Sequence, residues 1–117
     1  MLIKFNTGLN STTVFVTFTA DAGVSAYRVK HITVGKNATA AVLFIGNITN
    51  VITDAAGSLT TASILLGGPP TGATGQQYWF QDEGLTLDPR INSFITFTWA
   101  SAVTSSLLVG YDRVRKV

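Results

Sequence analysis

The chain of 117 residues contains no cysteine and only one histidine. The lack of cysteine excludes disulfides, thiol catalysis and cysteine-ligated zinc. His31 alone cannot build a zinc site, and a catalytic histidine needs a positioned nucleophile and an orienting acid, for which the sequence has no motif. We therefore interpret His31 as a surface or packing residue of a strand. We expect a protein that is not an enzyme and that binds no metal and no cofactor.

Charged side chains are also scarce, at 12% of the residues, which is about half the usual share of a globular domain. The hydrophobic share is 46%, yet the most apolar stretch, Ala40–Ile45, is far too short to span a bilayer. A free monomer with so little charge would tend to associate. The apolar excess therefore predicts a core plus contacts with other proteins, and no membrane partner.

Nucleic acid is not an expected partner either. The net charge is only +2, and the basic residues at the C-terminus, Arg113 and Arg115, have no interleaved aromatic residues on which bases could stack. We interpret this segment as a solvated strand end.

Two further patterns point only weakly to chemistry. The loop at residues 67–75 has the glycine spacing of a phosphate-binding loop, but Ala73 stands where that motif needs its lysine. The only carboxylate cluster consists of Asp82, Glu83 and Asp88. Because adjacent residues of a strand point to opposite faces, Asp82 and Glu83 cannot converge on a calcium ion or a glycosidic bond. We interpret the cluster as a solvated strand end.

The sequence does contain two nearly identical pentapeptides, Phe15–Thr19 (FVTFT) and Phe94–Thr98 (FITFT), each inside a strand-like segment. In each, valine, isoleucine or phenylalanine alternates with threonine, as in a strand with one face in a core. Each also carries one phenylalanine on its threonine-rich face, Phe15 in the first and Phe94 in the second. A lone monomer has no use for such outward aromatic residues, so both are candidate partner contacts.

If the two strands are neighbours in a sheet, Phe15 would lie across the ladder from Phe94. Such an aromatic pair would contribute about 0.5–1 kcal/mol beyond its burial.

A third candidate contact is the segment Tyr78-Trp79-Phe80. Strand alternation places Tyr78 and Phe80 on one face and Trp79 on the other. Three interpretations stay open for it, which are core packing, a partner interface and stacking on a sugar ring.

Turn residues divide the chain into short strand-like segments, and no amphipathic helix of ten residues is present. We predict a single all-β domain, residues 1–117, folded as one antiparallel β-sandwich of jelly-roll or Greek-key type with about eight to ten short strands. The segment Ser58–Leu66 suits either a strand or a short helix. The longest irregular stretch, which includes Pro69 and Pro70, cannot be a central strand and is a further candidate contact.

The segment Trp79–Pro89, WFQDEGLTLDP, is followed by a threonine-rich strand and a final Val-Gly-Tyr strand. Over residues 76–114 this pattern resembles the small all-β structural proteins of tailed bacteriophages, in which an acidic-Gly-Leu-x-Leu-x-Pro segment leads into a late strand of a compact sandwich. The resemblance implies a virion component made in the host cytoplasm, either a capsid decoration or cement protein or a neck or tail accessory protein. It also implies a trimer or higher oligomer that contacts other virion proteins such as the major capsid protein.

The expected function is therefore to stabilise a shell through apolar subunit contacts. The residues expected to make them are Phe15, Phe94, Tyr78, Trp79, Phe80, Pro69 and Pro70. The alternative is a carbohydrate- or receptor-binding module of a tail or neck, in which Trp79 or Trp99 stacks on sugar rings.

Overall fold

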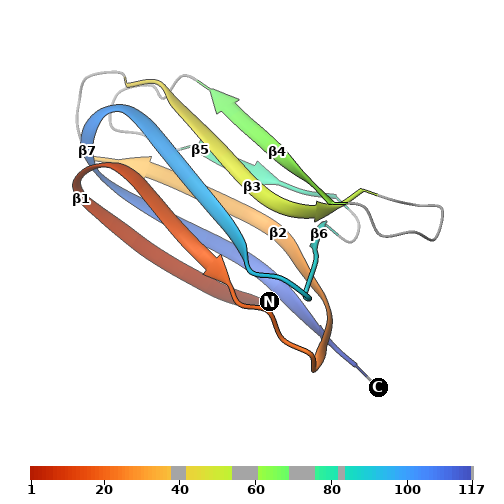
Figure 1. Cartoon of the computed structure of the whole chain (residues 1–117). Coiled ribbons are helices and arrows are strands. Elements are labelled where there is room, and N and C mark those ends of the chain that lie inside the picture. The colour runs from red at the N-terminus through yellow and green to blue at the C-terminus, as the bar shows by residue number, and fades with distance from the viewer. Residues whose placement is uncertain (38–41, 54–60, 69–75, 82–83, 117) are drawn as a thin grey trace.

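The computed structural model describes residues 1–37, 42–53, 61–68, 76–81 and 84–116. Within these ranges the chain is built of antiparallel strands and contains no helix (Figure 1). The all-β prediction is therefore confirmed. The described part of the segment Ser58–Leu66, which suited either a strand or a helix, lies in a strand. The strands are β1 (Leu2–Phe18), β2 (Val24–Lys36), β3 (Phe44–Ile52), β4 (Thr61–Gly68), β5 (Gln76–Trp79), β6 (Leu85–Leu87) and β7 (Ser93–Arg115).

Within the described residues the chain has seven strands where eight to ten short ones were predicted, because two of the strands are long and bent. β1 has 17 residues and β7 has 23. Each of them joins two segments that we expected to be separate short strands. The polar stretch at residues 6–12 does not end β1. Two register shifts between Gly8 and Thr13, with Asn10 at a left-handed φ of 47°, bend the strand while its pairing with β7 continues. A bend of this kind keeps the chain in the ladder, so a turn signal does not mark a strand end.

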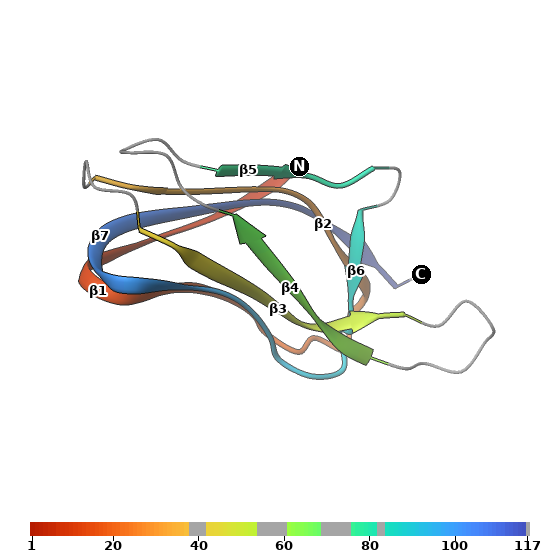
Figure 2. The same ribbon diagram turned by 90° about the horizontal axis from the view of Figure 1, so that it is seen from above.

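The strands follow the order β1-β7-β2-β6-β3-β4, with β5 paired to β2. β7 also pairs with β3, so that β7, β2, β6 and β3 form a small closed barrel. Figure 2 shows β2 and β5 on one side of the molecule and β3 and β4 on the other, with the bent β1 and β7 contributing to both. The strand β6 closes the barrel by pairing with β2 and, through Leu87 and Val51, with β3.

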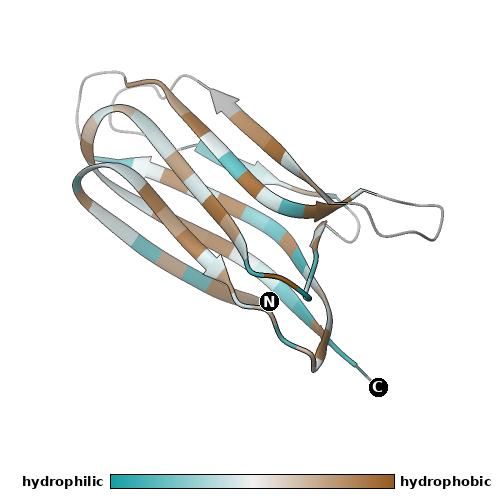
Figure 3. Cartoon of the chain, in the orientation of Figure 1, coloured by the Kyte–Doolittle hydropathy of each residue, from teal (hydrophilic) through white to brown (hydrophobic). Residues whose placement is uncertain are grey.

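The core lies between these two sides and follows the alternation of the sequence. In the second half of β1 and the first half of β7, every second residue is buried, and Figure 3 shows the hydrophobic bands recurring along both strands. Phe97 is at the centre, with its ring 5.6 Å from that of Phe44 and 6.2 Å from that of Tyr78. Among the described residues, the aliphatic and aromatic side chains with no exposed surface are Val29, Ile32, Ile48, Leu87, Ile95, Phe97, Leu107 and Val109.

The two similar strand segments are neighbours, as predicted, but in a different register. Phe15 lies opposite Thr96, and Phe94 lies opposite Thr17. The prediction of a direct Phe15–Phe94 pair is therefore wrong by two residues, and the two phenylalanines are diagonal neighbours. The buried face sets this register, because it places Val14 opposite Phe97 inside the core.

Candidate interaction surfaces

The outer side of the second half of β1, the first half of β7, β3 and β4 forms a surface that we call the threonine face. One row of it crosses four strands, from Phe15 through Thr96 and Asn47 to Leu65. Strand alternation creates the face, because the neighbours of these residues along each strand point into the core. Its members are Thr13, Phe15, Thr17, Ile45, Asn47, Thr49, Leu65, Phe94, Thr96 and Thr98.

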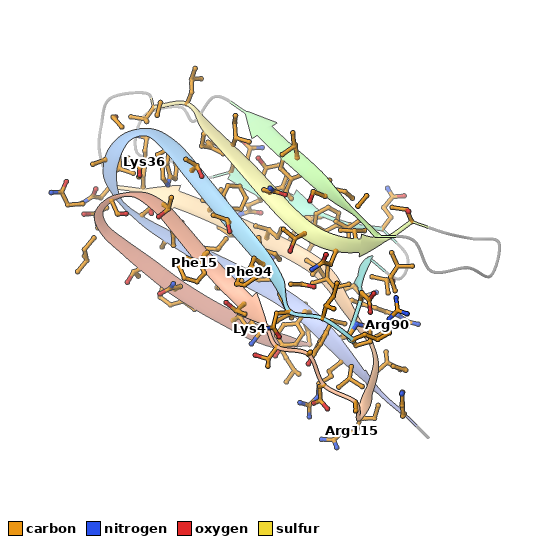
Figure 4. The ribbon with its side chains drawn as sticks, in the orientation of Figure 1. Lys4, Phe15, Lys36, Arg90, Phe94 and Arg115 are labelled. Atoms are coloured by element: carbon orange, nitrogen blue, oxygen red, sulfur yellow. The ribbon has the colours of Figure 1, made fainter. Side chains whose placement is uncertain are left out.

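Large apolar side chains on the threonine face are open to solvent. The exposed fraction is 47% for Phe15 and 39% for Phe94, and it rises to 59% for Ile45 and 69% for Leu65. Figure 4 shows Phe15 and Phe94 next to each other on neighbouring strands. An apolar patch of this kind is typical of a surface that another protein covers.

The threonine face carries no charge. The segments 5–20, 37–53 and 91–111 contain no Asp, Glu, Lys or Arg at all. Arg90 and Arg115 lie at one end of the elongated molecule (Figure 4), whose extents are 47 × 23 × 22 Å. Lys36 lies toward the opposite end but is 5% exposed. Covering the threonine face therefore requires the desolvation of no charged side chain, which is the main electrostatic cost of burying a surface.

A second exposed surface, the tryptophan face, lies on the outer side of the first half of β1, the second half of β7, β2 and β5. One of its rows runs from Ile3 through Gly110 and His31 to Trp79. The Trp79 ring lies 4.0 Å from the His31 ring, centroid to centroid, at an interplanar angle of 30°, and 68% of Trp79 is exposed. The other members are Phe5, Leu108, Thr33 and Gln77.

Polar groups surround this tryptophan. Its indole Nε1 donates a hydrogen bond of 3.3 Å to the side-chain oxygen of Gln77. His31 is buried beneath the ring, and its Nε2 is 2.8 Å from the hydroxyl of Thr33. His31 is therefore a packing residue that supports Trp79, in agreement with its interpretation from the sequence.

The segment Tyr78-Trp79-Phe80 divides as alternation predicts. Tyr78 and Phe80 are partly buried and pack against the core, which leaves Trp79 as the member available to a partner. Burial raises the pKa of the Tyr78 hydroxyl, so this group stays neutral at physiological pH. Pro69 and Pro70 lie outside the described residues, and their predicted contact role stays a prediction.

Trp99 cannot stack on a sugar as the alternative function supposed. It is buried, and its ring lies 5.3 Å from that of Phe44. The reason is its position in β7, where it shares the core face with Ile95 and Phe97.

The carboxylate cluster was interpreted as a solvated strand end, and its one described member is buried instead. Asp82 and Glu83 lie outside the described residues, and Asp88 is only 2% exposed instead of being solvated. Its two oxygens accept hydrogen bonds from the Arg90 side chain, at 2.9 Å from Nε and 2.6 Å from Nη2. Hydrogen bonding from Arg90 holds the pKa of the Asp88 carboxyl below its ordinary value, so the group is a charged structural anchor.

A cavity of about 640 Å³ lies beside this turn. Its walls combine apolar residues such as Val24 and Ile52 with Asp21, Asp88 and Lys116. Asp88 is engaged by Arg90, and one oxygen of Asp21 accepts a hydrogen bond of 2.8 Å from the Gly23 backbone. Among the described residues no group of three potential metal ligands exists, at this cavity or elsewhere.

Neither a protein-family model, nor a curated protein, nor a solved structure matches this chain. Within the described part of the chain there is also no helix with the length and apolarity needed to cross a membrane. The two exposed faces are therefore the main observations on which a function can be based.

Proposed function

We propose that the chain is a non-enzymatic structural protein of a virion, and specifically a capsid decoration or cement protein that stabilises a shell through apolar subunit contacts. One observation carries this proposal, which is the uncharged threonine face with its exposed phenylalanines. The buried face of each strand already supplies the core, so Phe15 and Phe94 are not needed to fold the domain. Their exposure is accounted for when another protein covers them.

Burial of apolar surface is the mechanism of this function. A stable protein–protein contact covers a total of about 1,600 Å². Phe15 and Phe94 would anchor such a contact, while the threonine hydroxyls around them can exchange hydrogen bonds with water or with the partner. On a symmetric shell the same contact repeats many times, so that individually weak contacts hold the lattice together by avidity.

The arrangement of the two faces suits a protein that links neighbours. We infer that the two sides sharing β1 and β7 act as the layers of a β-sandwich, so that the threonine face and the tryptophan face look outward from different layers. One face could contact the major capsid protein and the other a further copy of the chain, as in a trimer or higher oligomer. Neither contact involves nucleic acid or a membrane.

The substitution Phe15→Asp tests this function. We expect the variant to fold with an unchanged thermal midpoint but to be absent from particles, because a carboxylate on the threonine face would have to be desolvated on binding. The measurement is mass spectrometry of particles purified from cells that make either the parent chain or the variant. Ser25→Asp is the control, since it adds the same charge at an exposed position near the start of β2 that is not among the residues named for either face. Absence of the parent chain from particles, or retention of Phe15→Asp in them, would refute the proposal.

A carbohydrate-binding function is the second candidate, and the exposed indole of Trp79 favours it. His31 supports one side of the ring and Gln77 fixes its edge, which leaves the other side free to stack on a sugar. If this function is correct, the parent chain binds specific glycans on an array, and Trp79→Ala lowers that binding at least tenfold. Trp79→Phe retains an aromatic ring and is the conservative control. An array on which the parent chain binds nothing would remove this candidate.

A further inference from the structure

The strand β1 has an open edge. Among the described residues it pairs with β7 alone, so the side turned away from β7 has no neighbouring strand. Proteins usually protect such edges with charges, proline or inward-pointing lysines, because free backbone groups attract other strands. The first arm of β1, Leu2–Gly8, has this protection, since Lys4 points inward and its Nζ lies 5.2 Å from the centroid of the Phe18 ring.

The second arm of β1, Thr13–Phe18, carries no protecting residue of its own, and the nearby charge that borders the groove beside it is Lys4 of the first arm, which lies against Phe18. The second arm contains no charge, no proline and no glycine, and it consists of threonine, valine and phenylalanine. Such a composition has a high propensity to form β-structure with another strand.

Two hydrogen bonds show which backbone groups of the second arm point to the open edge. The Asn6 side chain donates to the carbonyl of Phe15 at 2.7 Å, and the Thr13 N–H donates to the Ser11 hydroxyl at 3.2 Å. In an antiparallel ladder the N–H and C=O of one residue point to the same side, and this side alternates along the strand. The edge groups are therefore those of Thr13, Phe15 and Thr17. The Phe15 N–H and both groups of Thr17 have no edge partner among the described residues.

We propose that the second arm of β1 pairs with the second arm of another copy of this chain, antiparallel, about a two-fold axis at Phe15. Thr13 then lies opposite Thr17 of the second copy, and Phe15 lies opposite its own equivalent. A strand edge can pair with itself in this way because each of its residues offers one donor and one acceptor. The absence of charge on the arm removes the repulsion that would oppose two identical edges.

The pairing would join the threonine faces of two copies into one surface. The two Phe15 side chains become cross-strand neighbours, and Phe94 of each copy lies diagonally beside them. A groove of about 360 Å³ borders this edge, with Lys4, Phe5 and Asn6 of the first arm on one side and Phe15, Val16 and Thr17 on the other, and the second strand would enter along it. Asn6 is exposed and can release the Phe15 carbonyl as the new ladder forms. The inference deepens the proposed assembly function and rests on it for its biological purpose.

The absence of cysteine makes the register directly testable. In the proposed pairing, residues 13 and 17 of two copies form a hydrogen-bonded pair with Cα atoms about 5.5 Å apart, which allows a disulfide. The Cα of residue 13 would be about 14 Å from that of its own equivalent, too far for a disulfide. We therefore expect a mixture of Thr13→Cys and Thr17→Cys chains under oxidised glutathione to give at least ten times more cross-linked dimer than either variant alone. Efficient cross-linking of either variant with itself would overturn the proposed register.

A matched pair of lysine variants separates edge pairing from stacking of whole faces. Thr17 and Thr98 both belong to the threonine face, but Thr17 is on the edge strand and Thr98 is on β7, which is flanked by other strands. Sizing with light scattering at about 100 µM should give a dimer for the parent chain and for Thr98→Lys, and a monomer for Thr17→Lys. A monomeric parent chain, or equal dissociation of both variants, would overturn edge pairing. Cross-linking and sizing use the purified chain and do not measure incorporation into particles. A failure of edge pairing can therefore be distinguished from a failure of the virion function.

Discussion

The substitution Phe97→Ala is expected to lower the free energy of unfolding by about 3–5 kcal/mol, the usual cost of removing a buried aromatic ring. Phe97 has no exposed surface, and its ring packs against those of Phe44 and Tyr78. The backbone at Gly46 lies so close that a Cβ there would be 2.5 Å from Cε2 of Phe97. Because domains are stable by only about 5–15 kcal/mol, the variant would be close to unfolding. Urea denaturation followed by tryptophan fluorescence measures the change.

Phe94→Ala is the matched control for this prediction. It removes the same side chain three residues earlier in the same strand, but from the outer face, where Phe94 is partly exposed. We expect a loss below about 1 kcal/mol, within the range of most surface substitutions. Equal losses for the two variants would mean that Phe94 contributes to the fold as much as Phe97 does, and would remove the reason to assign it to a partner.

The faces of the strands could be predicted from the sequence because side-chain alternation is a local property. Val14, Val16 and Phe97 are buried and Phe15 and Phe94 are exposed, as the period of two indicates. The same alternation predicted that Trp79 lies on the opposite face of its strand from Tyr78 and Phe80, as the structure shows.

Strand length and register could not be predicted, because they depend on pairing between distant segments. The bend in β1 is stable only because β7 bends beside it, and no local signal distinguishes such a bend from a turn. The open edge of β1 is likewise a consequence of strand order. The sequence alone contains no information that is specific to an edge position.

The extent of the threonine face was missed for a related reason. Residues 39–48 are apolar on both faces of a strand, a pattern of a central strand or of one covered on both sides, and β3 is central because β7 and β4 flank it. Its outer side is nevertheless uncovered within the described residues, which leaves Ile45 and Leu65 exposed. A strand that is apolar on both faces, in a chain without enough layers to cover it, is itself a signal of a protein contact.

The substitution Asp88→Asn is expected to lower the free energy of unfolding at pH 7 by roughly 1.5–3 kcal/mol, the cost of losing hydrogen bonds to a buried charged group. Besides the Arg90 side chain, the carboxylate accepts a hydrogen bond of 2.9 Å from the Arg90 backbone N–H. The turn that these bonds fix also connects separate parts of the chain, because the Asp88 N–H donates to the carbonyl of Asn50 and the Asp21 N–H donates to that of Pro89. Loosening the turn therefore weakens contacts to both β3 and the end of β1.

The effect of Asp88→Asn should disappear in acid. A carboxyl whose pKa is lowered in the folded state contributes its full stability above the ordinary value of 3.8, and that contribution is lost as the pH falls through the folded pKa. Urea denaturation of parent and variant at a series of pH values from 7 downward should therefore show a difference that is full at pH 7 and shrinks as the pH falls below 3.8. Asp112→Asn is the control, because 46% of the Asp112 side chain is exposed and its loss should cost little at any pH. A difference that stays the same size at every pH would mean that the shape of the side chain, and not its charge, fixes the turn.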